Sequence, residues 1–211
     1  MVSPPVQWLG LMRGLVRAAQ TPAGGLRNAL TFMVMPLLQP VLQRARRQLV
    51  VRVALDGVPH EFHVDSTGDL RVLYEVWAVR VYDVPPLRGA STLIDAGANI
   101  GASVAFFKAR CPNAVVHAYE PDPASFRKLV RNVGSLAGVR LHREAIWTTD
   151  GETVLYSSRQ GWDSSLIERQ GRPVRVACRT LESALREAGL DRVDLVKLDI
   201  EGAEFAVLRT P

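Results

Sequence analysis

The chain has few residues of the kinds that bind metals or form disulfides: two cysteines and four histidines among 211 residues. Cys111 and Cys178 stand far apart, in neither a metal-ligand nor a redox spacing. We expect two ordinary thiols in a reducing compartment rather than a disulfide. The histidines form no pair of the H-E-x-x-H kind, so no metal site is expected from them.

Long apolar runs are also missing. The longest, Leu30 to Leu38, is interrupted by Thr31 and Pro36 and falls well short of the ~20 residues that a bilayer core requires. The N-terminus does not combine a compact hydrophobic region with a small-residue cleavage site. The sequence therefore favours a cytoplasmic location.

Acidic residues are absent from the first 50 positions, and the first acid in the chain is Asp56. The same stretch holds six arginines: Arg13, Arg17, Arg27, Arg44, Arg46 and Arg47. The net charge of +5 therefore lies mainly in this region. A basic, partly apolar start favours either a weak contact with a membrane surface or a helical arm packed on its own domain, and we prefer the second.

The chain otherwise has the composition of a globular protein, with 47% apolar and 22% charged residues. Three parts are expected. They are a helical extension over residues 1–48, a β-hairpin and helix over residues 49–86, and an α/β domain over residues 87–211. The extension is expected to break at Thr21–Gly25, and Asp56–Gly57 to turn the hairpin. Apolar residues at helical spacing predict a helix over Asp69–Val81, which Pro85 then closes.

After residue 86, short apolar strands alternate with amphipathic helices, which predicts a parallel sheet covered on both faces. Expected strands are Ser91–Asp95, Ala114–Tyr119, Val139–His142, Pro173–Cys178 and Val193–Asp199, with a hairpin of Ala145–Thr148 and Glu152–Ser157 turned at Asp150–Gly151. Expected helices are Gly101–Arg110, one capped by Asp122 before Pro123, one from Thr180 to Gly189, and one starting near Ala203.

The first of these strands ends in D-A-G-A-N-I-G, Asp95 to Gly101. Gly97 lets the backbone turn sharply and approach a ligand, and Gly101 allows the next helix to sit close to the strand. Asp95 can accept a hydrogen bond from an ammonium group, and Asn99 can donate and accept at the loop tip. Glu120 ends the second strand, where dinucleotide-type folds place an acid for the two ribose hydroxyls.

A third element, V-D-L-V-K-L-D-I-E-G-A-E, places Asp199 at the end of another strand and Glu201 in the loop after it. Because parallel strands end at one edge of the sheet, Asp199 and Asp95 are expected in one crevice. The G-x-x-x-G spacing and the acid of Asp95 favour a ligand with a cationic amino-acid moiety over a pyrophosphate. For Glu204, stabilisation of a helix N-terminus is an equally good interpretation.

The motifs D-A-G-A-N-I-G, Y-E-P-D-P and K-L-D-I-E-G-A-E, in this order, resemble the FkbM family of methyltransferases over residues 90–209. Smaller similarities are W-D-S-S-L at 162–166 and R-T-L-E-S-A-L at 179–185. The resemblance implies a Rossmann-like class I methyltransferase fold, S-adenosylmethionine as methyl donor, and an acceptor oxygen on a sugar, a lipid-linked glycan or a secondary metabolite. It also implies that the sheet is C-terminally incomplete, since three strands are expected beyond residue 211.

The resemblance further implies roles for single residues. The amino-acid end of the cofactor would be held by Asp95, Gly97, Ala98, Asn99 and Gly101, the ribose by Glu120 and Pro121, and the adenine by the segment around Ala145. Asp199 and Glu201 would lie nearest the transferring methyl. Asp199 is the first candidate for the base, before Glu201 and His142, and these two acids are also the residues that a divalent metal would use, although none is expected.

Two other functions stay open from the sequence. An NAD-binding oxidoreductase shares the strand, glycine loop and acid, and a non-catalytic cofactor-binding module would fit a shortened sheet. A nucleic-acid substrate is not expected, because N-P-P-Y-type motifs and a basic surface interleaved with aromatics are absent from the sequence. No pattern indicates an oligomeric state.

Overall fold

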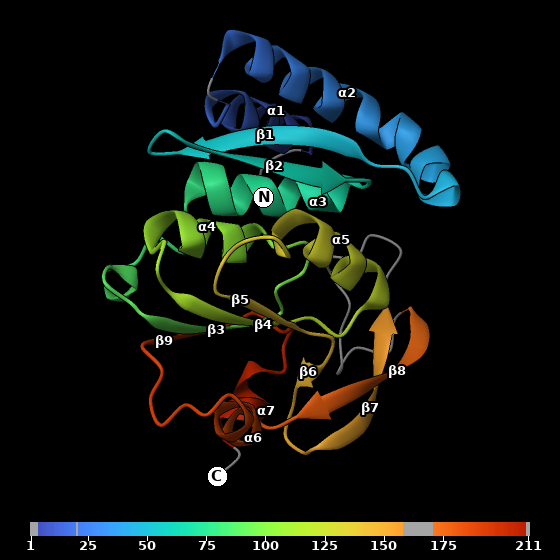
Figure 1. Ribbon diagram of the computed structural model, residues 1–211. Helices are drawn as coiled ribbons and strands as arrows, with labels where there is room; N and C mark the ends of the chain where they lie inside the picture. The colour runs from blue at the N-terminus through green and yellow to red at the C-terminus, as the bar shows by residue number, and fades with distance from the viewer. Residues whose placement is uncertain (1–3, 20, 158–170, 210–211) are drawn as a thin grey trace. The chain divides into compact units, whose positions relative to one another are not determined.

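The computed structural model describes residues 4–19, 21–157 and 171–209. The chain forms two compact units, Met1–Asp83 and Val84–Pro211 (Figure 1). Within the described residues, no helix is long and apolar enough to cross a membrane.

The first unit combines helices with one β-hairpin. Its elements are α1 (Pro4–Arg17), α2 (Pro22–Ala45), β1 (Leu49–Leu55), β2 (Val58–Val64), α3 (Thr67–Leu73) and the π-helix η1 (Tyr74–Val79). The predicted hairpin is confirmed: β1 and β2 pair antiparallel around Asp56 and Gly57, both with positive φ. The break before α2 falls slightly earlier than expected, because the Thr21 side chain accepts a hydrogen bond from the Gly24 amide and caps the helix.

The side chain of Asn28 joins three elements of this unit. Its amide nitrogen donates to the carbonyl oxygens of Leu15 (3.1 Å) and Arg52 (2.7 Å), and its oxygen accepts from the Arg52 amide. Because Asn28 is buried, these bonds fix α1 and α2 on the first strand of the hairpin. The expected helix over Asp69–Val81 is present as α3 continued by η1, and it ends where Arg80 adopts a left-handed conformation.

The second unit is an α/β structure with two sheets. Its elements are the 3-10 helix η2 (Pro85–Leu87), β3 (Thr92–Ala96), α4 (Ala102–Arg110), β4 (Val115–Tyr119), α5 (Pro123–Val133), β5 (Val139–His142), β6 (Ala145–Ile146), β7 (Gly151–Ser157), β8 (Arg172–Arg179), α6 (Leu181–Glu187), β9 (Leu195–Leu198) and α7 (Glu204–Leu208). The larger sheet has the order β5-β4-β3-β9 and all its strands are parallel.

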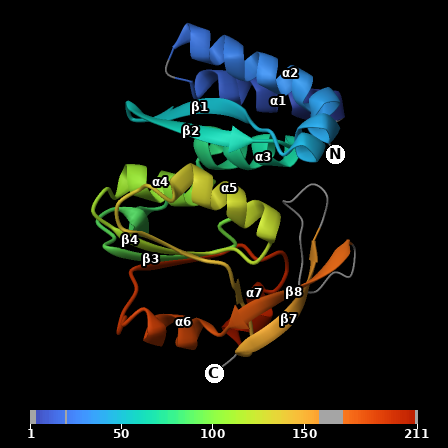
Figure 2. The same ribbon diagram turned by 45° about the vertical axis from the view of Figure 1, so that its right-hand side comes forward.

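This strand order is third, second, first and fourth along the chain, the order of a Rossmann-like fold on both sides of its switch point. Helices α4 and α5 cover one face of the sheet, and α6 and α7 lie on the other (Figures 1 and 2). On the second face, Ile94, Ala96 and Tyr119 of the sheet pack with Ala184 of α6 and Val207 of α7. The Rossmann-like α/β prediction is confirmed.

One expected pairing is wrong. The segments Ala145–Thr148 and Glu152–Ser157 do not form a hairpin with each other: β8 lies between them, parallel to β6 and antiparallel to β7. The Asp150 carboxylate accepts hydrogen bonds from the amide of Thr180 and the hydroxyl of Ser183, just beyond β8. These contacts and the eight-residue strand β8 outweigh the local turn signal of Asp150–Gly151.

Candidate functional site

The loop after β3 can adopt its course only with glycine at position 97. Gly97 has φ +80, and its amide donates to the carbonyl of Tyr119 (3.0 Å). A Cβ atom at this position would lie 1.9 Å from the carbonyl oxygen of Asp199. The loop therefore runs in backbone contact with the ends of both β4 and β9, at the switch point of the sheet.

Glu120 follows β4 and is bonded to the tip of this loop. One carboxylate oxygen accepts from the amide of Asn99 and the other from the amide of Asp122, each at 2.8 Å. Burial, opposed by these two hydrogen bonds, raises the pKa of Glu120 to about 7. The expected convergence of the glycine loop, Glu120 and Asp199 at one edge of the sheet is thus present in the structure.

The side chain of Asp95 has its polar partners inside the domain. It is fully buried, accepts a hydrogen bond from the Ser103 hydroxyl, and lies 2.8 Å from the ammonium nitrogen of Lys197. Its oxygens thus take part in an internal ion pair that joins β3 to β9, and the expected hydrogen bond from a ligand ammonium group to Asp95 stays a prediction.

Lys197 is a site residue that the sequence interpretation missed. Its ammonium also donates to the carbonyl oxygens of Gly97 (2.8 Å) and Ala96 (3.3 Å) and lies 3.9 Å from the Asp199 carboxylate. A lysine in the middle of the apolar strand V-K-L was the available signal, because a buried lysine needs a paired charge.

The acids after β9 lie at the surface of this edge. The Asp199 side chain is 55% exposed, and Glu201 is exposed with a left-handed backbone, φ +53, which is uncommon for a residue with a side chain. Glu204 accepts a hydrogen bond from the amide of Ile200 (2.8 Å). The structure therefore gives Glu204 a role in holding this turn, whereas the Asp199 side chain is largely exposed.

The other predicted site residues lie around the loop. Ala98 is buried, and its amide donates to the Tyr119 carbonyl. A Cβ atom on Gly101 would meet Leu129 and Val133 of α5 at 3.0–3.1 Å, so this glycine permits packing between two helices rather than between helix and strand. Pro121 is partly exposed beside Glu120.

His142 does not lie near the other candidate bases. Its ring stacks on Tyr119, with centroids 4.4 Å apart, and burial lowers its pKa. His142 is on β5, three strands from β9, which is roughly 14 Å at the usual strand spacing. The geometry therefore leaves Asp199 and Glu201 as the candidates for proton transfer.

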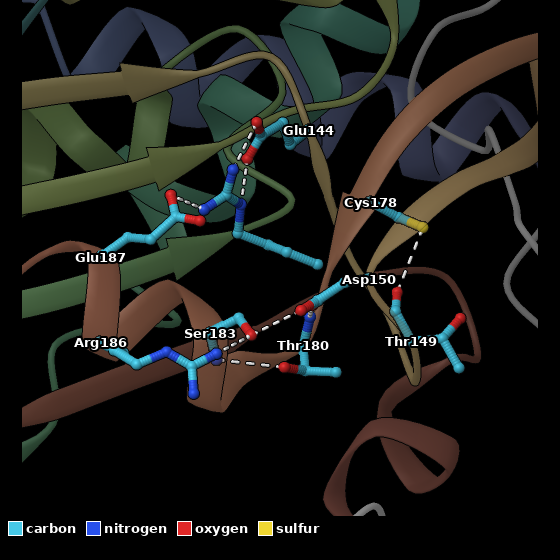
Figure 3. A network of polar contacts seen from close by, with 9 residues as sticks. Glu144, Thr149, Asp150, Cys178, Thr180, Ser183, Arg186 and Glu187 are labelled. Carbon is cyan, nitrogen blue, oxygen red and sulfur yellow. Dashed lines mark hydrogen bonds and ion pairs between the residues drawn. The ribbon is translucent and has the colours of Figure 1, made fainter.

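A polar network holds the segment around Ala145 (Figure 3). Arg179, at the end of β8, pairs with both carboxylate oxygens of Glu144 and with Glu187 of α6. Ala145 is buried and pairs with Cys178 of β8. Because α6 begins just after β8, this segment lies close to the first residues of α6. These ion pairs join residues up to 35 positions apart, so local sequence patterns could not reveal them.

The segment W-D-S-S-L at 162–166 lies outside the described residues. Among the residues that are described, no three of His, Cys, Asp or Glu are grouped so that they could hold a metal ion.

A parallel sheet of this order, with a glycine turn after its first strand and an acid after its second, is the arrangement of a Rossmann-like α/β domain. The family model described as the methyltransferase FkbM domain matches residues 95–210, more than half of the chain. The chain belongs to this family.

Three relatives support the assignment. The chain is 31% identical to "Methyltransferase 1" of Beauveria bassiana over 64% of each chain. It is 30% identical to "Methyltransferase sdnD" of Sordaria araneosa, over 70% of this chain and 71% of the relative. It is 30% identical to "2-O-methyltransferase NoeI" of Sinorhizobium fredii over 55% of each. The matched region thus spans between about half and about seven tenths of these relatives.

Proposed function

We propose that the chain binds S-adenosylmethionine at the carboxyl ends of β3, β4 and β9 and transfers its methyl group to a hydroxyl oxygen. Family membership supports methyl transfer, and the name of the relative NoeI, a 2-O-methyltransferase, supports oxygen as the acceptor. A sugar, a glycolipid or a secondary metabolite is the class of acceptor that we propose.

The observation that carries the cofactor proposal is the position of Glu120. Each of its oxygens accepts one backbone N–H, from Asn99 or Asp122, and a carboxylate oxygen has a second lone pair to offer. Glu120 can therefore accept both hydroxyls of a ribose without giving up the bonds that orient it. The residues present fit a nucleoside cofactor.

A bound S-adenosylmethionine supplies a methyl group that is already activated by its sulfonium. The chain's own residues must then orient the acceptor and take its proton. Asp199 is proposed as the base, because its carboxylate is exposed at the same edge of the sheet as Glu120 and lies 3.9 Å from the buried ammonium of Lys197. Glu201 is the second candidate.

The test is a methyl-transfer assay with radiolabelled S-adenosylmethionine and a panel of hydroxylated sugars, glycolipids and small metabolites. Asp199→Asn should lower kcat at least about 100-fold, the effect of losing a base, and leave cofactor affinity within a few-fold. Asp191→Asn, the same change at an exposed acid of the same unit, should have no effect. Unchanged turnover of Asp199→Asn would remove Asp199 from this role, and transfer only to nitrogen or carbon acceptors would refute the hydroxyl class.

A further inference from the structure

Helix α2 has an apolar stripe on its outward face. It consists of Leu26, Leu30, Met33, Leu37 and Val41, whose exposed fractions lie between 49% and 79%. Spacings of three and four residues place these side chains along one side of the helix. A surface helix ordinarily carries polar side chains on that side, but residues 28–42 contain no charged residue at all.

The opposite side of α2 is fully used inside its own unit. Phe32, Met35 and Leu42 are buried there, and Asn28 makes the hydrogen bonds to α1 and β1 described above. The exposed stripe is therefore a second apolar face of α2, in addition to the face that packs in the core of its own unit. An exposed apolar face of this kind marks a site of interaction with another protein or with a membrane.

The charged residues of this region favour one kind of partner for the apolar stripe. Five arginines of α1, α2 and the residues just after α2 are exposed: Arg13, Arg17, Arg44, Arg46 and Arg47. No acidic residue precedes Asp56. A second copy of the chain docked through this face would bring arginines together without carboxylates from this region to pair with them, which is unfavourable. An anionic lipid surface offers both an apolar layer and negative headgroups.

We propose that α2 is an interfacial membrane contact, with its stripe in the headgroup boundary of an anionic bilayer and the nearby arginines at the phosphates. The helix lies along the surface, since its inner face stays bonded to α1 and β1. This inference is independent of the proposed methyl transfer, because it uses only residues of the first unit.

The first test is co-sedimentation of the 211-residue chain with vesicles of phosphatidylcholine alone and of phosphatidylcholine with one quarter phosphatidylglycerol. The chain should bind the anionic vesicles and leave the neutral ones largely unbound. Leu30→Glu with Leu37→Glu should lower binding at least about tenfold. Val58→Glu with Val154→Glu, at exposed valines elsewhere, should not lower it.

The charge contribution has its own pair of variants. Arg44→Gln with Arg47→Gln should weaken binding about tenfold or more, and raised salt should do the same. Arg88→Gln with Arg175→Gln, an equal loss of charge at exposed positions of the other unit, should change binding little. Equal effects of the two pairs would show only a response to net charge and would overturn the proposed site.

A labelled variant tests the contact without disturbing the fold. Leu37 is the most exposed residue of the stripe at 79%, and both native cysteines are buried, so Leu37→Cys can carry an environment-sensitive dye. Its emission should shift to the blue on addition of anionic vesicles. No shift, or sedimentation analysis that shows a dimer lost in Leu30→Glu with Leu37→Glu while vesicles are not bound, would overturn the proposal.

Discussion

The ammonium nitrogen of Lys197 lies 2.8 Å from a carboxylate oxygen of Asp95, and both side chains are buried. This ion pair joins the middle of β9 to the end of β3, the two strands on either side of the switch point. The same ammonium holds the carbonyl oxygen of Gly97. The ion pair thus fixes the start of the loop after β3. Glu120 is hydrogen-bonded to the tip of the same loop, at Asn99.

Loss of one partner of this pair should destabilise the chain strongly. Lys197→Met leaves the Asp95 carboxylate buried and unpaired, which costs about 3–5 kcal/mol of unfolding free energy. Combining it with Asp95→Asn should recover part of the loss, because the uncompensated charge is gone. Urea unfolding of the two single variants and the double variant measures this coupling, and additive losses would contradict it.

Gly97 is expected to tolerate no side chain. Gly97→Ala combines a positive φ with a Cβ atom 1.9 Å from the Asp199 carbonyl oxygen, so it should cost more than about 3 kcal/mol and abolish cofactor binding. Gly89 is the matched control, since it has φ +82 and no atom within 4 Å of an added Cβ. Gly89→Ala should therefore cost only about 1–2 kcal/mol for its backbone strain. Equal stabilities of the two variants in urea would show that the contact with Asp199 is not tight.

Cofactor binding should depend on pH through Glu120. Its pKa in the free chain is raised from 4.5 to about 7, so below pH 7 the carboxyl is mostly protonated. Hydrogen bonds from two ribose hydroxyls favour the carboxylate, so binding should release a proton and tighten about tenfold from pH 6 to pH 8. Calorimetry in buffers of different ionisation enthalpy measures the released proton. In Glu120→Gln this pH dependence should disappear, and a dependence that persists would assign it to another group.

The stability of the free chain should change with pH in the opposite sense. Because the folded-state pKa of Glu120 is raised, the folded chain binds more protons than the unfolded chain between about pH 4.5 and 7. The contribution of Glu120 to stability is therefore lost as the pH rises through 7. Thermal unfolding of wild type and Glu120→Gln at pH 5 and pH 8 should differ most at pH 8. A constant difference would contradict the raised pKa.

Much of the fold followed from local patterns. Period and capping signals predicted the strands and helices from β3 to α5, including Asp122, whose carboxylate accepts from the amides of Ala124 and Ser125 as an N-cap. Pairing across long sequence distances was not predictable in this way. The expected pairing of Ala145–Thr148 with Glu152–Ser157 is wrong, since both segments pair with the distant strand β8, which begins at Arg172.

The candidate site was predictable in its position but not in its bonding. Strand ends indicated where Gly97, Glu120 and Asp199 meet. The sequence could not tell that Asp95 is bonded inward, because that depends on Lys197, a residue 102 positions away. The roles of these residues toward a cofactor remain predictions for the experiments above.

The most direct test of the account is calorimetric titration of the chain with S-adenosylmethionine and, separately, with NAD. We expect saturable binding of S-adenosylmethionine at one site, weakened at least about tenfold in Glu120→Gln, and no comparable binding of NAD. Tighter binding of NAD, or binding of S-adenosylmethionine that Glu120→Gln leaves unchanged, would contradict it.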